Sequence, residues 1–99
     1  DTFYLFSCFK EQKELRDFCH NLLSPLLQSH FQFDAIETLN TYLHTGGSLE
    51  KTAQLLFTHK NTVKYRLGKI RAALGNDLSE AQYLFKLQIA LIVHRLQNM

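Results

Sequence analysis

The sequence predicts a small all-α domain of about five helices that contains a helix-turn-helix. Apolar residues recur at helical spacing through most of the 99 residues, and glycine and proline, which are frequent in turn-rich β proteins, number only four and one. A chain of this length supports one hydrophobic core rather than two. It contains neither the ~18 consecutive apolar residues of a membrane-spanning helix nor the features of a signal peptide, so we expect a cytoplasmic protein without a membrane partner.

The first 33 residues contain one clear helical pattern. Residues 3–9 are apolar at nearly every position, which does not distinguish a buried strand from a short helix. From Glu11 onward the apolar residues follow helical spacing, namely Leu15, Phe18, Cys19, Leu22, Leu23, Leu26 and Leu27. Pro25 should kink or restart this helix, and residues 28–32 should form a loop. Since the chain opens without an initiator Met, we interpret residues 1–33 as a supporting helix and the tail of an upstream regulatory region.

The next predicted helix is delimited by its capping residues. Asp34 followed by Glu37 has the form of a capping box at the helix start. The core face would consist of Ile36, Leu39 and Leu43. Residues 46–47 are both glycine, which accepts the left-handed conformation at a helix C-terminus and should end this helix. Residues 34–99 would then form the helix-turn-helix domain with its C-terminal packing helix.

Residues 48–75 are predicted to form two helices joined by a tight turn. Ser48 is the expected N-cap of the first helix, whose apolar face consists of Leu49, Ala53 and Leu56. The second helix repeats this spacing with Val63, Leu67, Ile70 and Leu74. Residues 57–59 leave room for a turn of about three residues, the spacing of a helix-turn-helix. The small side chain of Ala53 would let the two helices approach closely.

The last predicted helix runs from about Glu80 to Gln97. A turn at residues 75–77 precedes it, and Ser79 with Gln82 resembles a second capping box. Apolar residues surround most of this helix, so it must be covered on more than one side. Its remaining surface should meet either the helix of residues 15–27 or a second copy of the chain. The side chains predicted to mediate dimerisation are Phe85, Ile89, Ile92 and Leu96.

Charge is distributed unevenly along the chain. Residues 1–50 carry three basic and seven acidic side chains, residues 51–76 carry six basic and none acidic, and residues 77–99 carry two of each. A solvated helix face normally mixes both signs, so the acid-free segment favours a surface for an anionic partner. Because the phosphates of a duplex attract such a surface whatever the base sequence, we predict double-stranded DNA as the partner.

The outward face of the second motif helix lies opposite Leu67. A helix that enters the major groove reads bases with its N-terminal residues and contacts phosphates with its edges. The predicted base contacts are Lys60, Asn61, Lys64 and Tyr65. Free N–H groups at the start of the first motif helix add to the predicted phosphate contacts, which are Ser48, Leu49, Thr62, Arg66 and Lys69. For Tyr65, a half-buried position on the helix shoulder is as well supported as base contact. For His59, a capping role is favoured over base readout.

Residues 39–75, LNTYLHTGGSLEKTAQLLFTHKNTVKYRLGKIRAALG, resemble the C-terminal helix-turn-helix domain of PucR/CdaR-type bacterial transcriptional regulators. The nine residues HKNTVKYRL carry most of the resemblance, which extends more loosely over residues 34–95 and includes a likeness at residues 14–27. It implies an upstream domain that senses an effector ligand, control of catabolic or related operons, and DNA binding as a dimer or larger oligomer.

Gly68 departs from the family, which usually has a basic residue there. Lys60 and Lys64 stand where arginine is frequent, and lysine lacks its bidentate fork.

We expect no enzymatic activity, no cofactor and no metal. The sequence shows no nucleophile beside a base, no paired carboxylates in an apolar context and no phosphate-binding loop. Cys8 and Cys19 match no zinc-ligand spacing, and the five histidines form no metal-binding motif. The rival interpretation is a non-catalytic helical module for protein–protein interaction whose basic segment serves only solubility.

Overall fold

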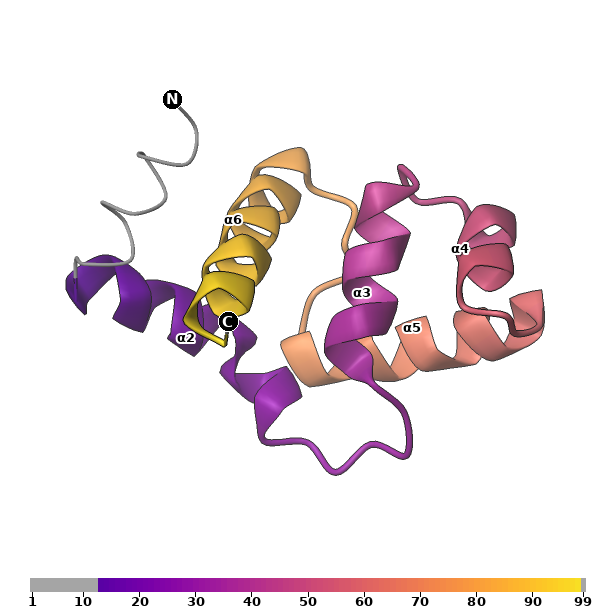
Figure 1. Cartoon of the computed structure of the whole chain (residues 1–99), viewed down its shortest axis with the longest axis horizontal. Helices are drawn as coiled ribbons and strands as arrows, with labels where there is room; N and C mark the ends of the chain where they lie inside the picture. Colours follow the sequence, from indigo (N-terminus) through magenta and orange to yellow (C-terminus); the bar gives the residue numbers. More distant parts are fainter. Residues whose placement is uncertain (1–12, 99) are drawn as a thin grey trace.

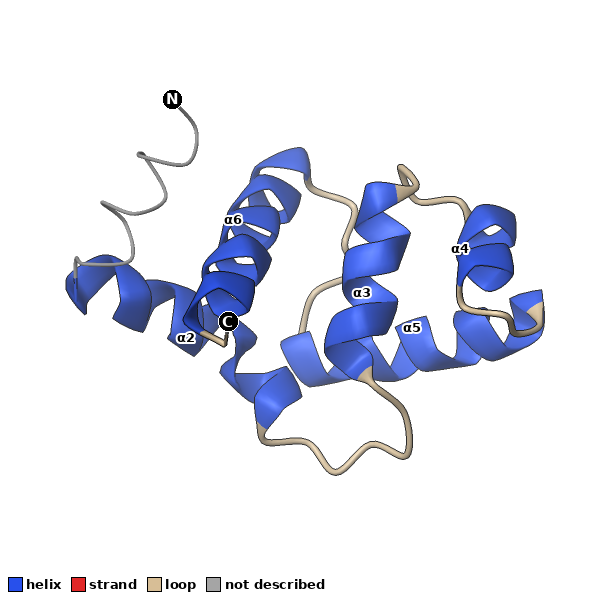
Figure 2. Ribbon diagram, viewed as in Figure 1, coloured by secondary structure: helices blue, strands red, loops and turns tan. Residues whose placement is uncertain are grey.

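The computed structural model of the chain describes residues 13–98, which form five α-helices and no strand (Figures 1 and 2). The helices are α2 (Lys13–Leu27), α3 (Ala35–His44), α4 (Leu49–Leu55), α5 (Lys60–Leu74) and α6 (Ala81–Gln97). The predicted all-α class with a helix-turn-helix is therefore confirmed. Residues 3–9, Cys8 and the expected helix start at Glu11 lie outside the described residues. Within residues 13–98, no helix combines the length and the apolar content needed to cross a membrane.

The N-caps of α3 and α4 form at the residues that the sequence predicts, although only the Asp34 half of the predicted capping box is present. The Asp34 carboxylate accepts a hydrogen bond from the Glu37 N–H at 3.0 Å, and the Ser48 hydroxyl oxygen accepts one from the Lys51 N–H at 3.1 Å. Gly46 and Gly47 follow α3 with φ angles of +72° and +86°, which L side chains rarely adopt. These local interactions set the boundaries of the two helices that precede α5.

One predicted helix cap and one of the two alternatives predicted for Pro25 are wrong. The capping box of Ser79 with Gln82 does not form, because Ser79 donates both its hydroxyl and its N–H to the Asp77 carboxylate, at 2.7 and 3.1 Å. These hydrogen bonds lower the pKa of Asp77 from its ordinary value. Glu80 is instead the N-cap of α6, without a side-chain cap. Of the two alternatives predicted for Pro25, a kink or a restart of the helix, the restart does not occur, because α2 continues through Pro25 and ends two residues later.

The core lies between α5 and α6, which do not contact each other directly but both pack against α2 and α3. Its fully buried members include Leu39 from α3, Val63, Leu67 and Ile70 from α5, and Leu87 from α6. Figure 1 shows α3 standing across α5, with α4 on one side of it and α6 on the other. The most extensive helix pairing is that of α2 with α6. Of the two coverings expected for α6, the structure therefore shows the helix of residues 15–27.

A small polar network joins α3 to α4. Thr52 is fully buried, and its hydroxyl donates to the Ser48 carbonyl oxygen at 2.6 Å. The Thr45 hydroxyl lies 3.0 Å from that of Thr52, and its oxygen accepts a hydrogen bond from the Ser48 N–H at 3.3 Å. A buried hydroxyl without partners would be costly, so these bonds constrain how α4 leaves α3. Through α4, the network also sets the position at which α5 begins.

Candidate nucleic-acid interface

The turn between α4 and α5 comprises residues 56–59, one residue more than predicted, because α4 ends at Leu55. The N–H groups of Phe57 and Thr58 donate to the carbonyl oxygens of Gln54 and Ala53, at 3.3 and 3.0 Å. This pair of bonds is a Schellman motif with Phe57 in the left-handed position, at φ +54°. The conformation costs a residue other than glycine roughly 1–2 kcal/mol, yet Phe57 is 96% exposed and gains no packing in return.

His59 caps the N-terminus of α5. Its Nδ1 accepts a hydrogen bond from the N–H of Asn61 at 3.1 Å, and this geometry agrees with the capping role favoured from the sequence. The imidazole therefore faces the backbone of the first turn. The Asn61 backbone N–H is occupied by this bond, while the Asn61 and Lys60 side chains are both exposed at the start of the helix.

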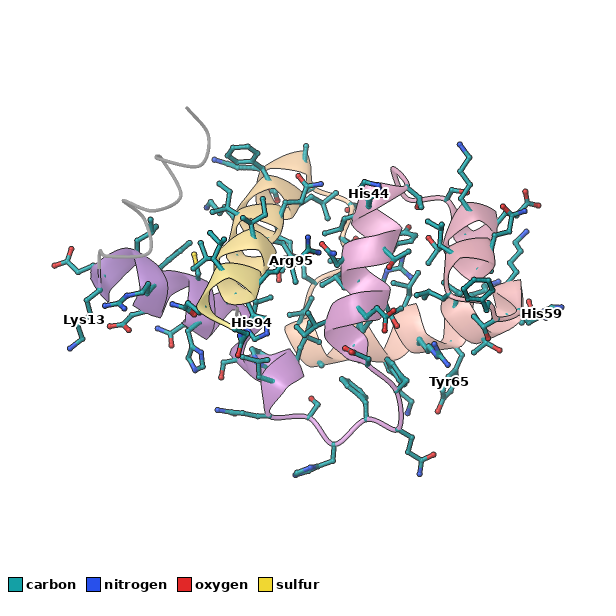
Figure 3. The ribbon with its side chains drawn as sticks, viewed as in Figure 1. Lys13, His44, His59, Tyr65, His94 and Arg95 are labelled. Atoms are coloured by element: carbon teal, nitrogen blue, oxygen red, sulfur yellow. The ribbon has the colours of Figure 1, made fainter. Side chains whose placement is uncertain are left out.

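The four candidate base contacts, Lys60, Asn61, Lys64 and Tyr65, are all exposed on α5. At the helical spacing of α5, Asn61 and Tyr65 point away from the buried Leu67, whereas Lys60 and Lys64 lie to one side, nearer the core face. Tyr65 is 62% exposed, so the half-buried alternative for its ring is wrong. In Figure 3 its side chain projects from α5 away from α4. The Lys69 ammonium lies 5.6 Å from the centre of the Tyr65 ring, a cation–π contact within this outward face.

Arg66 lies on one flank of the outward face and is partly buried. Its guanidinium lies over the ring of Phe33, 5.4 Å from the centroid, and Phe33 stacks on Phe31 with the ring centroids 4.9 Å apart. The loop between α2 and α3 therefore packs against α5. Sequence reasoning missed these two aromatic residues because they lie in and beside a stretch interpreted as a polar loop. Their alternation with polar residues in that loop was the available signal.

The residues predicted to contact phosphates do not all lie on α5. Ser48 and Leu49 begin α4, at the opposite end of that helix from the turn. Thr62 is partly buried in the first turn of α5, and Lys69 is exposed in its second half. Arg71 is the last basic residue of the acid-free segment, and its Nε donates a hydrogen bond to the Asp77 carbonyl oxygen at 3.1 Å. A Cβ atom added at Gly68 would meet no atom within 4 Å, so the fold leaves space for a Cβ at this position.

The predicted dimerisation residues differ in exposure. Phe85 and Ile92 are 63% and 37% exposed and lie two helical turns apart on α6. Ile89 is partly buried and packs against the core, and Leu96 is also partly buried. An exposed apolar strip therefore remains on α6 after α2 has covered its other side.

The described residues contain little that could bind a metal. Among residues 13–98, no three His, Cys, Asp or Glu side chains are grouped so as to hold an ion. Cys19 is buried between α2 and α6, and burial raises the pKa of its thiol, which disfavours the reactive thiolate. Among the described residues, the charged side chains of α5 are therefore the clearest chemical feature.

A helix-turn-helix whose second helix presents an exposed basic face is the fold of DNA-binding regulatory domains. The chain belongs to the family described as the PucR C-terminal helix-turn-helix domain, which matches residues 35–93. It is similar to the purine catabolism regulatory protein of Bacillus subtilis, with 33% identity over 85% of this chain and 16% of that protein. An uncharacterized protein of Mycobacterium tuberculosis is 43% identical over 62% of this chain and 15% of its own length.

A third relative, an uncharacterized protein of Thermomonospora curvata, is 34% identical over 82% of this chain and 46% of its own length. The chain therefore spans less than half the length of each of these three relatives. No solved structure matches the chain significantly. The family membership supports a DNA-binding regulatory domain, as the resemblance of residues 39–75 implied.

Proposed function

We propose that the chain binds duplex DNA by inserting α5 into the major groove. The observation that carries this proposal is the outward face of α5, which is exposed and lies within the acid-free segment of residues 51–76. Asn61 can address adenine through two hydrogen bonds, and Lys60 and Lys64 can donate to guanine acceptors. Tyr65 would contact bases or sugars in the second turn. Base readout by these side chains would select the operator.

Phosphate contacts would come from the flanks of α5 and fix its register in the groove. The Arg66 guanidinium lies over the Phe33 ring, 5.4 Å from its centroid, and from this position its N–H groups would bond a phosphate. Lys69 and Thr62 extend this set along the helix. Ser48 and Leu49 would add contacts from the start of α4, although the exposed Glu50 beside them opposes an anion. The rival interaction module would show no salt-sensitive association with DNA.

We further propose that the chain is the DNA-binding part of a longer cytoplasmic regulator, because it covers a minor part of each relative. Residues 34–99 would form the DNA-binding unit, and residues 1–33 would link it to an upstream region that senses an effector. The Bacillus subtilis relative is a catabolic regulator by name, which supports control of a catabolic operon. A homodimer would place two α5 helices about 34 Å apart, one turn of DNA.

Replacing Lys69 with alanine should weaken DNA binding equally on all sequences and lower the salt slope by roughly one unit, because one phosphate contact is lost. Fluorescence anisotropy with a random duplex at several salt concentrations measures both quantities. Lys86, an exposed lysine on α6, provides the matched control, and Lys86→Ala should leave the slope unchanged. A slope that stays constant in Lys69→Ala, with affinity lost only on one operator, would contradict the phosphate assignment.

The exposed strip of Phe85 and Ile92 should support weak self-association at high concentration. A glutamate at Ile92 would place a charge in that apolar contact, so Ile92→Glu should remain monomeric where the unsubstituted chain begins to dimerise. Sedimentation equilibrium over a concentration series measures this difference. Gln97→Glu adds the same charge elsewhere on α6 and should dimerise like the unsubstituted chain. A sharp monomer for the unsubstituted chain at every concentration would assign dimerisation to other parts of the protein.

A further inference from the structure

A hollow of about 370 Å³ lies between α5 and the loop that joins α2 to α3. The loop contributes His30, Phe31, Gln32 and Phe33, and α5 contributes Tyr65 and Lys69. Figure 3 shows Tyr65 projecting from α5 on the side where this loop lies. The hollow therefore opens beside the outward face of α5, which is the face proposed to enter the groove.

The lining of the hollow combines aromatic rings with hydrogen-bond donors. Phe31 and Phe33 stack on each other, and Arg66 covers Phe33 from α5, so the loop is held although it has no regular secondary structure. His30, Gln32 and Lys69 are exposed. None of the six lining residues, all within the described chain, is acidic. An anionic ligand that also carries apolar surface would suit this composition.

The proposed docking of α5 determines what would reach the hollow. The major groove is about 12 Å wide and an α-helix with its side chains is about 10–12 Å across, so a helix in the groove lies against the backbone on both sides. Arg66 and Lys69 mark the flank of α5 on which the loop lies. The strand on that flank would therefore pass along the loop.

We infer that residues 30–33 form a second DNA-contacting element and that the hollow receives the sugar–phosphate backbone of the strand flanking α5. This inference rests on the proposed function of α5. Lys69, Gln32 and His30 would donate hydrogen bonds to one phosphate, and the ring of Tyr65 and that of Phe31 would pack against the adjoining deoxyribose. The contact would fix the register of α5 without reading bases.

The test compares two double variants that each remove one exposed histidine and one exposed glutamine. His30→Ala with Gln32→Ala alters the hollow, whereas His44→Ala with Gln88→Ala alters the surface between α3 and α6. Figure 3 shows His44 at the far end of α3 from the loop. Anisotropy with a fluorescein-labelled random duplex at low salt should show about fivefold or greater loss for the first pair, as two lost hydrogen bonds imply. The second pair should bind within about twofold of the unsubstituted chain.

The outcomes separate this inference from the proposed function. If the unsubstituted chain binds DNA and both pairs bind equally well, the loop contact is overturned and the role of α5 stands. If the unsubstituted chain does not bind the duplex, both are overturned. A second test compares Gln32→Glu with Gln88→Glu. The carboxylate introduced at residue 32 should repel the phosphate, so Gln32→Glu should weaken DNA binding more than Gln88→Glu does. This difference in affinity should shrink as salt is added. Equal binding by these two variants would also overturn the loop contact.

Discussion

Replacing Leu67 with alanine should lower the free energy of unfolding by about 2–5 kcal/mol, the range observed when a buried leucine is truncated. Leu67 is fully buried on the core side of α5, opposite the face proposed to meet DNA. Its truncation removes apolar contacts and leaves a cavity in the core that α5 shares with Leu39 and Leu87. A native domain has about 5–15 kcal/mol of stability in total, so this loss would be a large fraction of it.

Urea denaturation followed by circular dichroism measures this loss. Leu55→Ala is the matched control, because Leu55 is 55% exposed on α4 and its truncation should cost less than about 1 kcal/mol. If both variants lost the same free energy, the core side of α5 would be wrongly assigned. The face proposed for DNA contact, which is defined as the opposite side, would then be wrong as well.

Replacing Asn61 with alanine should cost about 1–3 kcal/mol of binding free energy on the true operator and relax the base preference at one position. Asn61 is exposed in the first turn of α5, and alanine is well tolerated in helices, so the loss would come from readout rather than folding. This pattern differs from that of Lys69→Ala, which should weaken binding on all sequences alike.

Binding-site selection with the unsubstituted chain and with Asn61→Ala compares the two preferred sequences. Asn21→Ala serves as the control, since Asn21 is an exposed asparagine on α2, outside the helix-turn-helix. The control should select the same operator as the unsubstituted chain. An unchanged operator for Asn61→Ala would remove Asn61 from the set of base contacts.

Much of the fold was predictable from the sequence because its determinants are local. The caps at Asp34 and Ser48 depend on residues three positions apart, and the core faces of α3 and α5 follow from helical spacing. The error at Ser79 shows how a local rule fails. The Ser79 N–H, which a capping box would give to the Gln82 side chain, donates instead to the carboxylate of Asp77 two residues earlier, and the Ser79 hydroxyl donates to the same carboxylate.

The surroundings of α5 were harder to predict because they depend on contacts between distant segments. Arg66 and Phe33 are 33 positions apart, and no spacing rule relates a loop residue to a later helix. The left-handed conformation of Phe57 was also unexpected, since glycine or asparagine normally occupies such a position. The exposed face of α5 could be predicted, whereas the loop beside it became visible only in the fold.

Methylation protection by dimethyl sulfate tests most directly whether α5 lies in the major groove. The reagent methylates guanine at N7, which faces the major groove, and adenine at N3, which faces the minor groove. On an operator obtained by selection, bound chain should protect guanines within each half-site and leave the neighbouring adenines reactive. Protection of adenine N3 with reactive guanines would contradict major-groove insertion, and the absence of any protection at saturating chain would contradict DNA binding by this face.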